Sequence, residues 1–256
     1  MNHSQSVLHR TRLARLSFTL LVAVLTGGCA SQSANLTNPQ ADPWEPFNRK
    51  IYTFNDGFDR ALMKPIAKGY DAIMPDAPQR GVRNFFHNLK FPMTFLNLLL
   101  QGKFEDSFTA TGRFVMNSTV GLLGFFDVAT REGVPEFDED FGQTMAKWGW
   151  KDSRYLVVPF FGPHTVRDLG GRVADSYTSP VSYMVREHDE YRPLIIDIIS
   201  LRASLLPFDQ DLKEANDPYA LMRDAFLQNR EFKIYDGEPP MTDYDALLEE
   251  ENLGSE

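Results

Sequence analysis

The sequence of 256 residues contains one cysteine, Cys29, which excludes a disulfide within the chain. Metal-binding spacing is also absent, because the histidines of the chain body, His87, His164 and His188, stand far apart and in no pattern typical of a zinc site. The sequence therefore predicts neither a disulfide-stapled domain nor a metal centre.

Common catalytic motifs are missing as well. The chain has no Gly-x-Ser-x-Gly elbow and no glycine-rich loop that could cradle a phosphate. We therefore predict that the protein is not an enzyme and uses no cofactor. A lipid hydrolase built on Ser107 or Ser118 with His164 stays open as an alternative, since a triad without a motif is rarely visible in one sequence.

Positive charge is scarce, and the formal charge of −9 argues against nucleic-acid binding, which needs a basic footprint. Three arginines lie before the apolar segment 16–26, and Gly-Gly-Cys follows, ending at Cys29. This pattern is typical of a bacterial lipoprotein signal, although Thr26 stands where such signals usually carry leucine. Cleavage would remove residues 1–28, which hold those three arginines and no acid, and would take the charge from −9 to −12.

The new N-terminus, Cys29, is predicted to carry the lipid anchor. Two or more acyl chains hold a protein firmly on a membrane. Ala30 after the cysteine, rather than Asp, favours delivery to the outer membrane. We interpret 29–41, rich in Ser, Asn and Gln, as a flexible tether.

The body that follows, 42–236, shows the spacing of helices and no sustained alternation of apolar and polar residues, so the fold class is all-α. Asp42 is a candidate N-cap, with Pro43 at the first helical position and Glu45 in capping-box spacing. Pro65 should end or bend the first helix. Residues 238–256 carry seven acids and no Lys or Arg, so 237–256 is predicted to be a disordered tail.

Two segments of the body, 91–101 and 114–126, carry no charge. Both are shorter than the roughly 20 apolar residues that a spanning helix needs. Two placements suit them, a protein core or a single leaflet of a membrane, and periodicity does not distinguish the two. Arg113 and Asp127 bound the second segment.

Polar residues gather within two helical turns in 162–172, where Thr165 or His164 should open a helix. Two readings stay open here: a surface turn with an internal ion pair, or a polar lining within an apolar body. Gly170 and Gly171 allow close approach of another backbone. The acidic residues of 131–140 are interpreted as a solvated turn without the ligand spacing of a calcium loop.

Several blocks together resemble the MlaA (VacJ) lipoprotein family. The first is Asp-Pro-Trp-Glu-Pro-Phe-Asn-Arg at 42–49. The others lie at 113–114, 117–122, 124–129, 141–144, 159–163, 167–168 and 217–219, in the order of the family. The resemblance covers nearly all of 42–235.

The resemblance implies an all-helical ring lying in the periplasmic leaflet of the outer membrane, anchored by lipid. Phospholipids misplaced in the outer leaflet would pass through an amphipathic channel to the periplasmic carrier MlaC, which would maintain lipid asymmetry. Trimeric porins of the OmpF/OmpC type are the implied membrane partners. A lipoprotein that only scaffolds porins, without transport, is the alternative.

Residue roles follow from this picture as expectations. His164, Arg167, Asp168 and Arg172 are predicted to line the head-group path, because they cluster within an apolar body. Phe47 and Asn48 are expected to set the gate or the ring geometry. The residues expected in the membrane are Phe95, Leu99, Phe114, Leu122, Leu123, Phe125 and Phe126.

Overall fold

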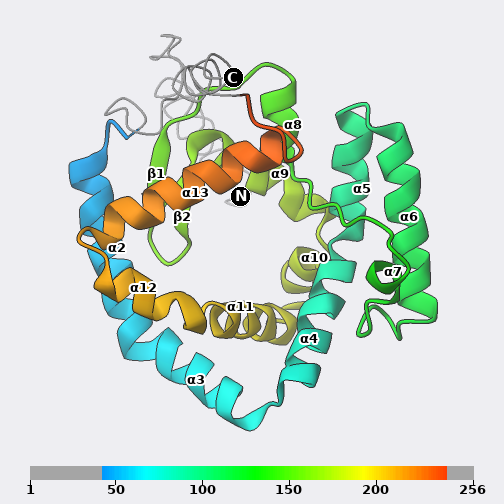
Figure 1. Ribbon diagram of the computed structural model, residues 1–256, viewed down its shortest axis with the longest axis horizontal. Coiled ribbons are helices and arrows are strands. Elements are labelled where there is room, and N and C mark those ends of the chain that lie inside the picture. The colour runs from blue at the N-terminus through cyan, green and yellow to red at the C-terminus, as the bar shows by residue number, and fades with distance from the viewer. Residues whose placement is uncertain (1–41, 241–256) are drawn as a thin grey trace, which may run out of the picture. The chain divides into compact units, whose positions relative to one another are not determined.

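The computed structural model describes residues 42–240, all of which belong to one compact unit. The predictions for the signal segment, Cys29, the tether and most of the tail lie outside the described residues. The unit is built almost entirely of helices, as the sequence predicts (Figure 1). Its elements are α2 (Glu45–Phe58), η1 (Asp59–Met63), α3 (Lys64–Ile73), α4 (Asp76–Leu89), α5 (Phe91–Leu100), α6 (Phe104–Thr119), α7 (Val128–Arg131), α8 (Phe141–Lys147), β1 (Tyr155–Val158), β2 (Gly162–Thr165), α9 (Val166–Thr178), α10 (Pro180–His188), α11 (Arg192–Ser204), η2 (Leu206–Phe208), α12 (Asp209–Glu214) and α13 (Pro218–Ile234).

Within this unit the helices follow one another around a circuit (Figure 1). The first stretch runs from α2 through the π-helical turn η1 into α3, so Pro65 bends the helix and does not end it. Helix α11 packs against α3 and α4. Helix α13 closes the circuit, because it contacts α8 and β2 and its first residues pair with α2 through Arg49 and Asp217.

The only sheet within residues 42–240 is a hairpin of β1 and β2, in which Tyr155 pairs with Thr165 and Val158 with Gly162. Pro159 follows β1 directly and lies in the turn, where no ladder hydrogen bond is required of it. Helix α9 begins immediately after β2, with Thr165 as its N-cap. The prediction of a helix opening at this residue is confirmed.

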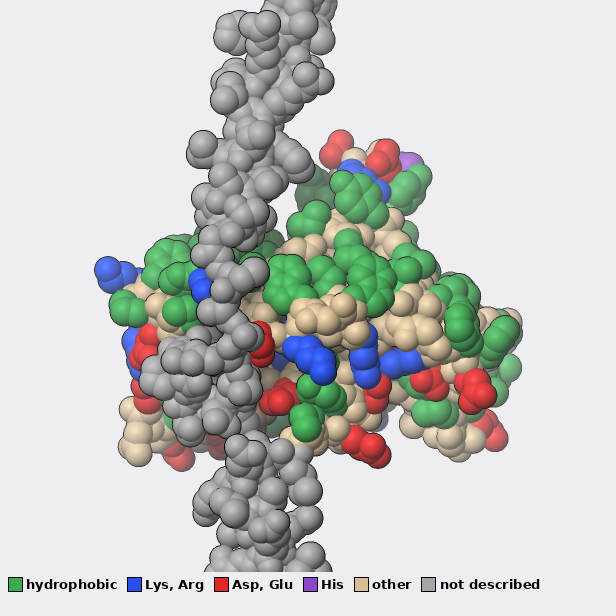
Figure 2. Space-filling view, turned by 90° about the horizontal axis from the view of Figure 1, so that it is seen from above, with side chains coloured by type: hydrophobic (Ala, Val, Ile, Leu, Met, Phe, Trp, Pro, Cys, Tyr) green, Lys and Arg blue, Asp and Glu red, His purple; other side chains and the backbone are tan. Residues whose placement is uncertain are grey.

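The interior of the unit is polar and its surface is rich in large apolar side chains. The apolar cluster is small and is centred on Tyr155, Val157 and Tyr219. The polar side chains that are buried are Asp42, Asn48, Gln79, Thr94, Asn97, Ser107, Arg113, Asn117, Glu139, Gln143, Thr144, His164, Thr165, Arg167, Asp175, Ser200 and Arg230. Figure 2 shows apolar side chains gathered in a belt on one face, with many of the charged ones beside it. In the part of the chain that the structure describes, no helix is long and apolar enough to cross a membrane.

The charge-free segment 114–126 is helical only as far as Thr119 and then forms a tight turn. Leu122 and Leu123 have φ of 52° and 60°, a conformation that non-glycine residues rarely adopt. They are 65% and 67% exposed, so the core placement is wrong for them. Of the other residues expected in the membrane, Phe126 is exposed, whereas Phe95, Leu99, Phe114 and Phe125 are half-buried. Their position in a membrane stays a prediction.

Asp42 does not cap α2, which begins at Glu45, two residues after the predicted first helical position at Pro43. The Asp42 carboxylate is instead buried and accepts hydrogen bonds from Asn48 Nδ2 at 2.7 Å and from the Tyr219 hydroxyl. This capping prediction is wrong because the carboxylate binds Asn48 on α2 and Tyr219 on α13, and Tyr219 is 177 residues away.

Candidate functional site

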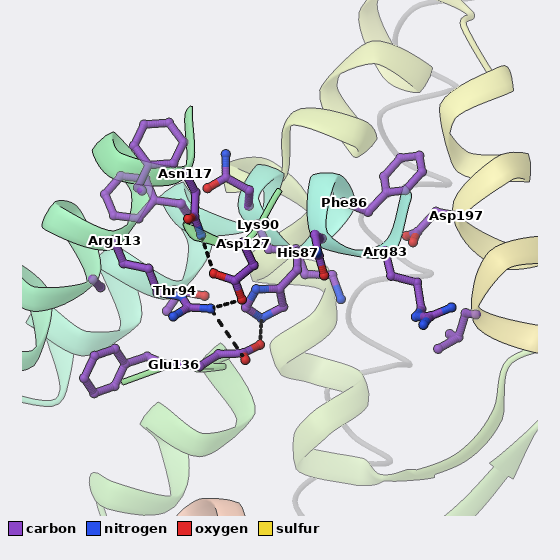
Figure 3. Close-up of a pocket in the computed structure, with 17 residues that line it drawn as sticks. Arg83, Phe86, His87, Lys90, Thr94, Arg113, Asn117, Asp127, Glu136 and Asp197 are labelled. Atoms are coloured by element: carbon purple, nitrogen blue, oxygen red, sulfur yellow. Dashed lines mark hydrogen bonds and ion pairs between the residues drawn. The ribbon is translucent and has the colours of Figure 1, made fainter. Parts of the chain in front are cut away.

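A cavity of about 260 Å³ opens between α4, α5, α6 and α11 and the segment that joins α6 to α8 (Figure 3). Its walls carry charges of both signs. The ionisable side chains that line it are Arg83, His87, Lys90, Arg113, Asp127, Glu136 and Asp197. Some of these charges are paired within the protein and others are not.

Arg113 anchors one side of the cavity. Its guanidinium is buried and donates to Asp127 Oδ2 at 2.6 Å, to Thr130 Oγ1 at 2.8 Å and to the carbonyl of Val134 at 2.8 Å. Arg113 and Asp127, which bound the charge-free segment in sequence, thus meet in space because the turn after α6 reverses the chain. Burial raises the pKa of Asp127, but bonds from Thr130 and Asn117 and the charge of Arg113 outweigh it, so the pKa lies below its usual value.

Glu136 completes this network. Its carboxylate is 3.0 Å from His87 Nε2 and 3.7 Å from the Arg113 guanidinium. The hydrogen bond with His87 lowers the pKa of Glu136 more than burial raises it. Both carboxylates on this side are therefore ionised at neutral pH and already have cationic partners.

Arg83 and Asp197 lie on the other side of the cavity (Figure 3). Within residues 42–240, Arg83, Asp197 and Lys90 form no ion pair, and the ion pairs of the cavity wall join the other ionisable residues. Burial raises the pKa of Asp197, and the nearby charge of Lys90 offsets part of that rise. The cavity consequently offers a ligand two cations and one carboxylate without ion-pair partners in the described part of the chain: Arg83 and Asp197 on this side, and Lys90 at the C-terminal end of α4.

An apolar pocket adjoins the charged cavity, and Phe86 lines both. Only apolar side chains line this second pocket: Val82, Phe85, Phe86, Phe125 and Ile196. Aromatic side chains also line the charged cavity, where Phe91 and Phe114 stack with ring centroids 4.3 Å apart. A polar site beside an apolar one matches the chemistry of an amphiphilic ligand.

The four residues predicted for the head-group path come together where β2 joins α9. Arg172 Nη1 lies 3.2 Å from His164 Nε2. Arg167 is only 2% exposed and donates to the carbonyls of Trp150 and Lys151 at 2.9 and 2.8 Å, so its charge is used inside the fold. Asp168 pairs with Arg230 at 2.8 Å. None of the four lines either pocket described above, and their role in a path stays a prediction.

The acidic segment before α8 is not a solvated turn, so that interpretation is wrong. Glu139 is buried and pairs with Lys103 at 2.8 Å, and Asp140 pairs with Arg230 at 2.6 Å. Asp138 forms an ion pair with Lys233. Two of these cations lie on α13, about 90 residues along the chain, where spacing rules could not relate them to the acids.

Phe47 and Asn48 occupy different surroundings although they are adjacent. Phe47 is 52% exposed, whereas Asn48 is fully buried. The Asn48 amide donates to Asp42 and to the carbonyl of Tyr155, and its oxygen accepts from the Val157 amide at 2.9 Å. Asn48 therefore fixes α2 to β1, which gives it a part in the geometry of the circuit; the gate stays a prediction.

Replacing Asn48 with Ala is expected to lower the free energy of unfolding by about 2–3 kcal/mol. The change leaves the Val157 N–H and one oxygen of the Asp42 carboxylate buried without partners, at about 1–3 kcal/mol for each such group. Urea unfolding of the detergent-solubilised protein measures the effect. Asn229→Ala, at an exposed position of α13, is the control and should stay within about 0.5 kcal/mol of the parent. Equal effects of the two changes would contradict the anchoring role.

The basic residues of α4 and its C-cap that line the cavity were not predicted from the sequence. Arg83, His87 and Lys90 recur at steps of four and three, which places them on one helical face. A polar face that carries three basic residues beside an apolar one was the signal available in the sequence.

The serines proposed for a hydrolase have other partners. Ser107 Oγ donates to the carbonyl of Phe104 at 2.6 Å, and Ser118 Oγ accepts from Asn88 at 2.9 Å. His164 bonds with Gly162 and Arg172, so the described part of the chain contains no Ser–His hydrogen bond for either serine. It likewise holds no group of three or more potential metal ligands.

Comparisons with known proteins give a consistent result. The family model described as MlaA lipoprotein matches residues 40–233. The intermembrane phospholipid transport system lipoprotein MlaA of Escherichia coli is 32% identical over 229 residues, which cover 88% of this chain and 90% of that protein. An uncharacterised protein of Rickettsia conorii is 34% identical over 75% of this chain and 78% of its own length.

A solved structure also matches. It comes from work on the structural basis for maintenance of bacterial outer membrane lipid asymmetry. The match has a TM-score of 0.67 and 29% sequence identity, and it covers 75% of this chain and 98% of that one.

Proposed function

Since the chain belongs to the MlaA lipoprotein family and so has a role in phospholipid transport and outer-membrane lipid asymmetry, we propose that it removes misplaced phospholipids from the outer leaflet. The lipids pass through an amphipathic path in the helical unit and are handed to a soluble periplasmic carrier of the MlaC type. The family is one of transport lipoproteins, and no step of this proposal breaks a covalent bond.

The observation that carries the proposal is the reversal of the usual arrangement of side chains. Soluble proteins bury large apolar residues, and contiguous exposed apolar patches mark surfaces of interaction. Here Arg113, Arg167 and Arg230 are buried, whereas Leu122 and Leu123 are exposed. A unit of this kind is suited to hydrocarbon outside and to polar head groups inside.

The adjoining pockets supply the reason why a lipid could move without an energy source. Moving a charged head group through hydrocarbon unpaired costs many kcal/mol. Charges on the cavity wall remove most of that cost, and the apolar pocket beside it can receive acyl chain. The helices satisfy their own backbone groups, so a short helical unit can lie in one leaflet.

Anchoring and partners complete the proposal. Acylated Cys29 would hold the unit on the periplasmic leaflet of the outer membrane. Trimeric porins of the OmpF/OmpC type would fix it laterally in that membrane. A lipoprotein that only scaffolds porins is the alternative, and the charged cavity favours transport over it, because a scaffold has no need of unpaired charges in a cavity.

Asymmetric vesicles test the proposal directly. The purified acylated protein is inserted into vesicles whose distal leaflet holds a labelled phospholipid, and a soluble carrier is added as acceptor. Transport moves the label to the carrier, a scaffold leaves it in place, and a hydrolase releases fatty acid or head group. If the label leaves the distal leaflet no faster than it does in protein-free vesicles, the proposed function is contradicted.

In the same assay, Arg83→Glu is expected to slow transfer by about 10–100-fold. The change replaces an attractive contact to the phosphate with a repulsive one, and a charge-assisted hydrogen bond is worth about 1.5–3 kcal/mol. Arg80→Glu is a matched control, because Arg80 lies three residues earlier on α4, is exposed and does not line the cavity. Equal transfer by the two variants would exclude this cavity from the lipid path.

A further inference from the structure

Charges without internal partners distinguish one part of the cavity. Arg83 and Asp197 come from α4 and α11, two helices in contact. Lys90 is the C-cap of α4, seven residues after Arg83 and about 10 Å along the helix axis. The remaining ionisable groups of the wall already pair with one another, Arg113 with Asp127 and His87 with Glu136. A ligand in this cavity therefore meets two cations and one carboxylate.

The carboxylate decides which phospholipid suits this set. A head group that carries only negative charge is attracted by Arg83 and Lys90 but repelled by Asp197. A head group with a phosphate and an ammonium provides an opposite charge for each of the three: the phosphate for Arg83 and Lys90, and the ammonium for Asp197. A primary ammonium also donates hydrogen bonds to a carboxylate, which a trimethylated one cannot do.

We propose that the cavity selects phospholipids with a primary ammonium in the head group, phosphatidylethanolamine above all, with the phosphate held by Arg83 and Lys90 and the ammonium held by Asp197. The inference rests on the proposed function and adds to it a preference among lipids. The apolar pocket that shares Phe86 with the cavity receives the start of an acyl chain.

The surroundings of Asp197 agree with this assignment. Its neighbours on the same helix, Ile195, Ile196 and Ile198, are large, apolar and exposed. A carboxylate among them has no structural partner within residues 42–240, and burial raises its pKa. A cation bound beside it favours the ionised form, as the charge of Lys90 already does in part.

Lipid retention measures the preference. The acylated protein in detergent is equilibrated with equal amounts of phosphatidylethanolamine and phosphatidylglycerol of identical acyl chains, and the lipid that remains bound after gel filtration is quantified by mass spectrometry. The parent protein is expected to retain phosphatidylethanolamine about tenfold over phosphatidylglycerol, the effect of one charge-assisted contact. Asp197→Asn should bring the ratio to within about twofold of one, because the amide cannot pair with the ammonium.

Two controls isolate the carboxylate. Asp211→Asn, at an exposed position of α12 outside the cavity, should keep the tenfold ratio. Arg83→Gln should reduce retention of both lipids and leave their ratio unchanged. A second measurement needs no variant: an N-acetylated phosphatidylethanolamine, which has no ammonium, should lose the preference on the parent protein, and phosphatidylcholine should fall between the two lipids.

The outcomes separate this inference from the function on which it rests. Transfer of lipid in vesicles with an equal ratio of retained lipids overturns the inference alone, as does a preference that survives Asp197→Asn. A protein that neither transfers nor retains phospholipid overturns both. Soluble glycerophosphoethanolamine at equal concentration should not displace the lipid, since it lacks acyl chains; displacement would assign the cavity to a soluble phosphodiester and overturn the inference.

Discussion

Replacing Arg230 with Met is expected to lower the free energy of unfolding by about 3–5 kcal/mol, the usual cost of removing one partner from a buried ion pair. Arg230 is buried and bonds through both terminal nitrogens to Asp140, at 2.6 Å each, and through one of them to Asp168 at 2.8 Å. Met fills a similar volume without charge, so Asp140 loses its cationic partner and Asp168 loses the nearer of its two, keeping Arg167 at 3.4 Å. Urea unfolding of the detergent-solubilised protein at pH 7 measures the loss.

Arg60→Met is the matched control for this change. Arg60 pairs with Asp56 one helical turn away, and its side chain is 67% exposed. A surface pair of this spacing contributes about 0.3–0.5 kcal/mol. If Arg230→Met costs no more than Arg60→Met, the buried network is not a main source of stability.

At acidic pH, the free energies of unfolding of the parent and of the Arg230→Met variant should differ less than at pH 7. Burial raises the pKa of Asp140, but the bonds and charge of Arg230 outweigh it, so the folded-state pKa lies below the unfolded value of about 3.9. The stability gained from this depression is present above pH of about 4 and disappears as the pH falls through the folded pKa. The variant lacks this contribution, so the two unfolding free energies should converge below pH 4, and a constant difference down to pH 2 would contradict the role of Asp140.

The same residues show how far the sequence could be interpreted. The helix start at Thr165 was predicted, because a capping side chain bonds to an amide only three residues along. The all-helical fold class followed from periodicity in the same way. These are local rules, and they hold where the partner is near in sequence.

The partners of Arg230 and of Asp42 were not predicted, because they lie 90 and 177 residues away. The carboxylate of Asp42 has the right spacing for a cap, yet Asn48 and Tyr219 bind it and α2 begins later. A buried polar interior makes this failure general. Apolar periodicity finds the apolar face of a helix, whereas the polar contacts inside the unit are specified by long-range pairs.

The second large effect on stability is expected at the glycines of α9, because the adjacent positions Gly170 and Gly171 have different surroundings. A Cβ added at Gly171 would lie 2.5 Å from the amide nitrogen and 2.9 Å from the Cα of Gly142, at the start of α8. A Cβ at Gly170 would meet nothing within 4 Å. The close backbone approach that glycine allows in this stretch thus occurs at Gly171 and not at Gly170.

Gly171→Ala is expected to lower the free energy of unfolding by about 2–3 kcal/mol, because the methyl group meets backbone that has no rotamer to change and α8 and α9 must move apart. Gly170→Ala should raise it by about 0.5–1 kcal/mol, since alanine favours the helix and finds open space. Opposite signs from neighbouring, chemically identical changes are a stringent check, and urea unfolding under one set of conditions measures both.

The Gly171→Ala change should also weaken the network around Arg230. Asp140 caps α8 and Asp168 lies on α9, so moving the two helices apart separates the two carboxylates that Arg230 binds. Arg230→Met should then cost less in that variant than in the parent, and fully additive effects would contradict the coupling.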